Sequence, residues 1–140
     1  MKTYTGPTLG GATATIQCPD WCVVDHEYEG DHADDTFHEA EPLELAPPRD
    51  RDRNYRGPIV PLLDLRLRLH STERTPDAAL VWLQYSEYNG DGIELDVRGL
   101  DQLLTRLDTY RAGVADLREK LAAAENERRR TSLHAVEGSS

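Results

Sequence analysis

Regularly spaced apolar residues occur only in the second half of this chain, and that division most limits what the chain can fold into. No apolar period of either the helix or the strand type runs through residues 18–42. Such a segment gains too little from burial to offset the conformational entropy that it loses on ordering. The first third of the chain must therefore be held by something other than a hydrophobic core, or stay solvated.

The same segment holds both cysteines and three of the five histidines of the chain. They are Cys18, Cys22, His26, His32 and His38. The spacing Cys-x3-Cys-x3-His brings three ligands into one short loop, and a fourth histidine completes the tetrahedral set that Zn²⁺ takes from thiolate and imidazole. Zinc contributes folding free energy on the order of 10 kcal/mol in small modules. We therefore expect a closed structural zinc site, with either His32 or His38 as the fourth ligand.

Other interpretations of these residues stay open at this point. A disulfide is disfavoured in a cytoplasmic chain, a redox pair usually has two intervening residues, and the histidines could belong to a solvated acidic loop. A zinc ion with only three protein ligands could instead activate water, with Asp20, Asp25 or Glu27 as general base. No deaminase signature, phosphate-binding loop or nucleophile turn accompanies the cluster. We therefore expect a non-catalytic, protein-binding or regulatory module rather than a metal-dependent enzyme.

Charge disfavours another class of function. The formal net charge is -10, and residues 1–45 contain ten acidic residues but a single base, Lys2. Because affinity for a phosphate backbone comes from Lys and Arg, we do not expect nucleic-acid binding, although an acidic inhibitor that mimics nucleic acid is an alternative. The sequence has no apolar run long enough to cross a membrane and no signal-peptide core, so we expect a cytoplasmic protein.

The later apolar pattern predicts an α+β fold with an N-terminal zinc-bound loop, a three- to four-stranded antiparallel meander and a long C-terminal helix. Leucines alternate with polar residues over 63–70, residues 78–88 suit a central strand, and 93–98 alternate again after the turn signal Asn89-Gly90-Asp91-Gly92. Residues 12–17 suit a further short strand. We expect the core to lie in residues 59–130 and to form without the metal.

Beyond Gly99 the apolar spacing becomes that of a helix. Its stripe consists of Leu100, Leu103, Leu107, Tyr110, Val114, Leu117, Leu121 and Ala124, and Leu104 widens it at the start. A helix of roughly 30 residues spans ~45 Å, whereas the strands reach only ~20–30 Å, so the far half needs another surface. We expect a homodimer through this helix, with folding back onto residues 59–63 or the zinc loop as the alternative.

These patterns predict one domain between two loose ends. We expect a flexible arm over residues 1–11, a single domain over 12–130 and a disordered tail over 131–140. Within the domain we expect a zinc-binding segment at 16–42, a polar linker at 46–58, and the meander and helix at 59–130.

Several residues match a pattern of Cys-Pro-x-Trp-Cys, a nearby Asp-His, a later His before a Pro, and a Trp in a subsequent strand: Cys18, Pro19, Trp21, Cys22, Asp25, His26, His38 with Pro42, and Trp82. In this the chain resembles a group of small actinomycete proteins that share a domain of unknown function. The resemblance is specific over residues 16–42 and loose over 78–107. It implies the same fold and a metal site but no activity, and it favours His38 over His32 as fourth ligand. The insert at 49–56 and the extended helix depart from the pattern, so the resemblance implies nothing about them.

Overall fold

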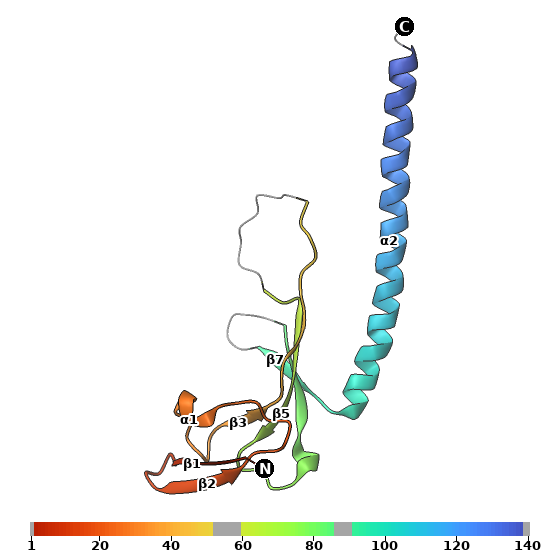
Figure 1. The fold of residues 1–140 in the computed structure, drawn as a ribbon. Coiled ribbons are helices and arrows are strands. Elements are labelled where there is room, and N and C mark those ends of the chain that lie inside the picture. Colours follow the sequence, from red (N-terminus) through yellow and green to blue (C-terminus); the bar gives the residue numbers. More distant parts are fainter. Residues whose placement is uncertain (1, 52–59, 86–90, 139–140) are drawn as a thin grey trace. The chain divides into compact units, whose positions relative to one another are not determined.

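The computed structural model describes residues 2–51, 60–85 and 91–138 and divides the chain into two compact units, Met1–Asp96 and Val97–Ser140 (Figure 1). The first unit holds all the described strands, and the second is one helix. We expected one domain over residues 12–130. The division falls after Asp96 because the strands satisfy their backbone hydrogen bonds with one another, whereas the helix satisfies its own along its axis.

The N-terminus forms a two-stranded antiparallel hairpin. Strand β1 (Thr3–Pro7) pairs with β2 (Thr13–Gln17) along its whole length, from Thr3 opposite Gln17 to Pro7 opposite Thr13. Gly11 has a φ of 85°, which glycine adopts without strain in the connecting turn. Strand β2 confirms the prediction for residues 12–17. The flexible arm predicted for residues 1–11 is wrong, because β1 pairs its backbone with β2.

A five-stranded antiparallel sheet makes up most of the rest of the first unit. Strands β5 (Leu63–His70), β6 (Leu80–Gln84) and β7 (Gly92–Leu95) form the predicted meander, with a single 3-10 turn at Pro76–Ala78. Two further strands, β3 (Phe37–Glu39) and β4 (Leu43–Leu45), both pair with β5.

Two predicted connections fall wholly or partly outside the described residues. Of the turn Asn89-Gly90-Asp91-Gly92, only Asp91 and Gly92 are described, and Gly92 begins β7. The polar linker predicted at 46–58 is described only as far as residue 51.

The sheet has one apolar face, and the residues buried on it are Leu83, Leu69 and, opposite Leu69, His38. The register places Leu43, Leu65, Leu83 and Ile93 in one row across β4, β5, β6 and β7. Leu83 is 6% exposed, whereas Leu43 at the edge of the row is 70% exposed. The other buried residues of the described chain lie around the Cys/His segment: Gly6, Cys18, Cys22, His26 and Ala33.

The prediction that the core lies in residues 59–130 is therefore wrong for most of the buried residues. Segments of the hairpin, of the loop after it and of the larger sheet converge near the Cys/His residues, so most of the buried side chains of the described residues lie there. Of the two aromatic residues described on and just after β6, Trp82 is half-buried and Tyr85 is 61% exposed.

The opposite face of β5 is more than a solvated surface. Arg66 lies 3.0 Å from Asp64 and 3.4 Å from Glu39, and Arg68 lies 2.9 Å from the other Glu39 oxygen. The Arg68 guanidinium also sits 4.0 Å from the centre of the Phe37 ring, a cation–π contact. These carboxylates raise the pKa of the Arg66 guanidinium. Glu39 and Phe37 thus fasten the short β3 to β5.

The second unit is helix α2 (Val97–Gly138), whose 42 residues correspond to a length of about 63 Å. It is longer than predicted, and the disordered tail predicted over 131–140 is wrong as far as residue 138, while 139–140 lie outside the described residues. At the start of this extension the Thr131 hydroxyl donates to the Glu127 carbonyl. Neither α2 nor any other helix in the described ranges has an apolar stretch that would let it cross a bilayer.

The contrast along the apolar row gives a stability prediction. We expect Leu83→Ala to lower the free energy of unfolding by about 2–3 kcal/mol, because truncation of a buried side chain leaves a cavity in its place. Leu43→Ala removes the same atoms from an exposed site and should cost less than about 1 kcal/mol. Urea unfolding followed by circular dichroism measures both, and equal losses for the two variants would show that we have located the buried row wrongly.

Candidate metal centre

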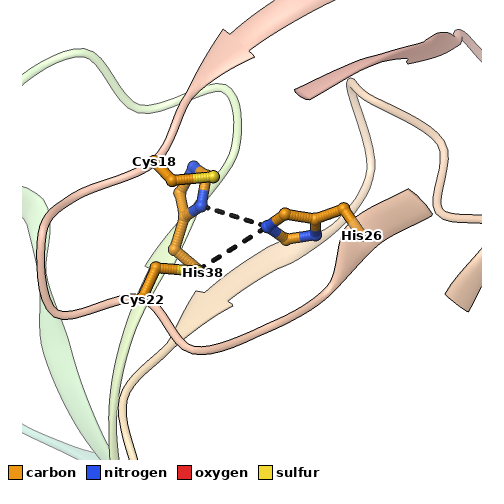
Figure 2. A group of neighbouring side chains, drawn as sticks. All are labelled: Cys18, Cys22, His26 and His38. Atoms are coloured by element: carbon orange, nitrogen blue, oxygen red, sulfur yellow. Dashed lines mark hydrogen bonds between the residues drawn. The ribbon is translucent and has the colours of Figure 1, made fainter. Parts of the chain in front are cut away.

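Four side chains bring one ligand atom each to a common point (Figure 2). The ligand atoms of Cys18, Cys22, His26 and His38 all lie within 4.8 Å of one another, and all four residues are buried. The Nε2 atom of His26 is 3.3 Å from Nδ1 of His38 and 3.7 Å from Sγ of Cys22. A tetrahedral zinc ion with ordinary bond lengths would separate two nitrogens by about 3.3 Å and a nitrogen from a sulfur by about 3.6 Å. The donor types and these two separations therefore fit a tetrahedrally coordinated ion.

The structure distinguishes the two histidines proposed as fourth ligand. His38 is 2% exposed and belongs to the cluster, whereas His32 is exposed and lies outside it. Ala33, the next residue, is fully buried, and its N–H donates to the Pro7 carbonyl. The loop is thus anchored beside His32 without His32 entering the site.

Backbone hydrogen bonds position the two cysteines. Cys18 follows β2, and its N–H donates to the Lys2 carbonyl at 2.8 Å, which ties it to the start of β1. The Cys22 N–H donates to the Pro19 carbonyl at 3.0 Å and closes the turn between the thiols. The Val23 N–H then donates to the Glu39 carbonyl at 2.9 Å. The loop that carries Cys22 is therefore held against β3, the strand that carries His38.

His26 begins the single-turn helix α1 (His26–Glu29). The Asp25 carboxylate caps this turn by accepting a hydrogen bond from the Tyr28 N–H at 3.1 Å. Gly30 ends it in the left-handed conformation, with a φ of 68°. This reversal brings Asp31 back beside the His26 ring.

Asp31 orients the His26 ring from the side away from the cluster. Its Oδ2 atom is 2.8 Å from Nδ1 of His26, so that nitrogen donates to the carboxylate and the Nε2 lone pair faces the other ligands. The Tyr4 hydroxyl donates to the Asp31 carbonyl, and the Tyr4 ring centre lies 5.4 Å from that of His26. The Tyr4 ring leaves no room for a Cβ at Gly6. Strand β1 therefore supports the site although it supplies no ligand.

The electrostatics of the protein alone favour uncharged ligands. Burial lowers the pKa of His38, and the neighbouring His26 lowers it further. Burial also raises the pKa of the Cys18 thiol, and the adjacent Cys22 adds to this. Neutral imidazole is the form that binds a metal, whereas a buried thiolate pair needs a cation beside it. The arrangement therefore suits a divalent cation at its centre.

The residues proposed for other roles lie outside the cluster. Asp20, Asp25 and Glu27, the candidate general bases, are exposed, and Asp25 is engaged as the cap of α1. Trp21 is half-buried and lines a surface pocket that also touches Cys18. Asp31 and Tyr4 were not among the residues that the sequence predicts for the site. Nothing in spacing or composition separates Asp31 from the other acidic residues of residues 1–45.

Together these features define an α+β protein with a buried Cys2His2 cluster that could hold a metal ion. The family described as Domain of unknown function (DUF6907) matches residues 3–123, and the chain belongs to this family. No curated protein and no solved structure matches the chain. The matched range includes both sheets and all four cluster residues, so the cluster lies within the family domain.

The contact between His26 and Asp31 predicts a measurable effect on metal affinity. Asp31→Ala should weaken binding roughly 10- to 100-fold, because His26 loses the carboxylate that fixes its ring and tautomer. Glu27→Ala, an exposed acidic residue next to His26, is the matched control and should leave affinity unchanged. Competition with a chromogenic chelator measures both, and equal affinity of Asp31→Ala and the unsubstituted protein would rule out this role for Asp31.

Proposed function

We propose that this chain is a non-catalytic, zinc-stabilised module that acts by binding protein. The burial of four convergent protein ligands carries the first half of this proposal. A catalytic zinc site keeps a coordination position for water and usually has three protein ligands. Here His38 supplies the fourth ligand, and the acidic residues that could serve as general bases are exposed and outside the cluster. These observations favour a structural role over a hydrolytic one.

The donor set favours zinc among the available metals. Two sulfurs and two imidazole nitrogens in tetrahedral arrangement are typical ligands of structural zinc, whereas calcium and magnesium take oxygen ligands. Both cysteines are free, as metal coordination requires. Because thiolate ligands of this kind persist in a reducing compartment, the proposal includes a cytoplasmic location.

The proposed ion would join segments that have few other means of packing. The cluster draws one ligand from the end of β2, one from the loop after it, one from α1 and one from β3 (Figure 2). The buried hydrophobic residues of the described chain are only Cys18, Cys22, Ala33, Leu69 and Leu83. A zinc contribution on the order of 10 kcal/mol is large beside the ~1.5–3 kcal/mol of a single buried aliphatic side chain.

Exposed apolar surface supports the second half of the proposal. Leu43, Leu45 and Ile93 lie on the apolar side of the sheet and are 70%, 52% and 48% exposed. Helix α2 carries further exposed apolar residues in a regular stripe. Contiguous apolar surface on a folded protein is typical of sites that bind other proteins. A regulatory role exercised through protein contacts fits these surfaces better than chemistry on a small molecule.

Metal analysis tests the zinc site directly. We expect one zinc per chain by plasma emission on protein purified without a His tag, and tetrahedral thiolate–cobalt absorption after substitution with Co²⁺. Removal of the ion with a chelator should lower the melting temperature. Protein without stoichiometric metal, whose thiols react equally with and without chelator, would contradict the proposal. A cobalt spectrum with a bound water ligand would favour the enzyme alternative.

The two histidines provide a matched pair of variants. His38→Ala should lose stoichiometric zinc, because it removes one of four ligands, whereas His32→Ala removes an exposed ring and should retain it. Cys22→Ser should behave like His38→Ala. Zinc content per chain and the cobalt spectrum are the measurements. Retention of zinc by His38→Ala, or its loss from His32→Ala, would show that the ligand set is different.

A further inference from the structure

We infer that helix α2 pairs with the same helix of a second copy of this chain, so that the protein is a homodimer. The inference rests on α2 alone and does not depend on the zinc site. Taken by itself, α2 leaves Tyr110, Val114, Leu117 and Leu121 at 73%, 48%, 65% and 63% exposure. These residues follow one another at intervals of three and four, which places them on one side of the helix.

The width of the stripe identifies the kind of partner. Helices that pack on a globular core usually present three apolar residues in every seven, whereas the seam of a coiled coil presents two. After Leu104 this stripe has two per seven, at Leu107, Tyr110, Val114, Leu117, Leu121 and Ala124. A narrow seam is complementary to another narrow seam. The partner is therefore a helix with the same spacing, which a second copy of α2 supplies through a two-fold contact.

The area available is sufficient for a stable dimer. Burial of one aliphatic side chain removes about 60–120 Å² from water, by the usual relation between transfer energy and area. The six large exposed residues Leu104, Leu107, Tyr110, Val114, Leu117 and Leu121 on each of two helices would then bury on the order of 700–1,400 Å². Specific protein interfaces bury about 1,200–2,000 Å². The upper part of this estimate falls within that range, so the exposed stripe can by itself provide a small specific interface.

Charge on the rest of the helix keeps the other faces in water. Asp101, Asp108, Asp116 and Glu119 occupy positions away from the stripe, and Lys120 pairs with Asp116 at 2.9 Å along the helix. The stems of Arg and Lys residues beside the seam can cover its edges while their charges stay hydrated. The family match extends to residue 123, where the stripe is almost complete, so the seam lies within the family domain and not in an appended tail.

Sedimentation equilibrium of the full chain tests the inference. We expect a dimer at tens of micromolar. Leu117→Asp should raise the dissociation constant by about 100-fold or more, because each dimer loses two buried leucines and gains two facing charges. Ala112→Asp introduces the same charge on the opposite side of the helix and is the matched control, which should leave the dissociation constant unchanged. Far-UV circular dichroism of each variant reports independently whether α2 stays helical and the chain folded.

Two results would overturn the inference. One is a monomeric mass for the unsubstituted chain at these concentrations, including the case in which α2 folds back within one chain. The other is equal dissociation of the Leu117→Asp and Ala112→Asp dimers. Neither result bears on the zinc site, and loss of zinc without loss of the dimer would contradict only the proposed function.

Discussion

Two thiols and two imidazoles converge in the first unit, where most of the buried side chains of the described residues lie. Cys18 and Cys22 lie on either side of the turn after β2, His26 begins α1, and His38 lies in β3 opposite Leu69 of β5. These segments have short strands, a single helical turn and few buried apolar side chains. Hydrophobic burial alone is a weak means of holding them, and a shared metal ion would replace it.

The environment of the cluster shows how the surrounding fold serves it. Asp31 fixes the His26 ring, the Tyr4 hydroxyl holds the Asp31 backbone, and Gly6 leaves space for the Tyr4 ring. Strand β1 therefore supports the cluster through these contacts, although it supplies no ligand. This accounts for an ordered hairpin where composition alone indicated a loose arm. Outer contacts of this kind orient metal ligands and raise their basicity, so they are part of the site.

A feature of this fold could be predicted from the sequence when neighbouring residues alone indicate it. Cys and His are rare and chemically distinctive, so the cluster residues could be named from sequence, and alternation in 63–70 revealed β5. Strands β3 and β4 have three residues each, too few to show a period, and they exist because β5 pairs with them. Asp31 could not be told from its acidic neighbours, since its role depends on a reversal at Gly30. The location of the core was predicted wrongly because burial depends on contacts between segments distant in the sequence, whereas the apolar period describes a single segment.

X-ray absorption at the zinc edge of the purified, untagged chain tests the central claim most directly. We predict a first shell of two sulfurs at about 2.3 Å and two nitrogens at about 2.0–2.1 Å, the coordination of a closed Cys2His2 site. A first shell that contains a water oxygen, or fewer than two sulfurs, would contradict a structural zinc centre formed by Cys18, Cys22, His26 and His38.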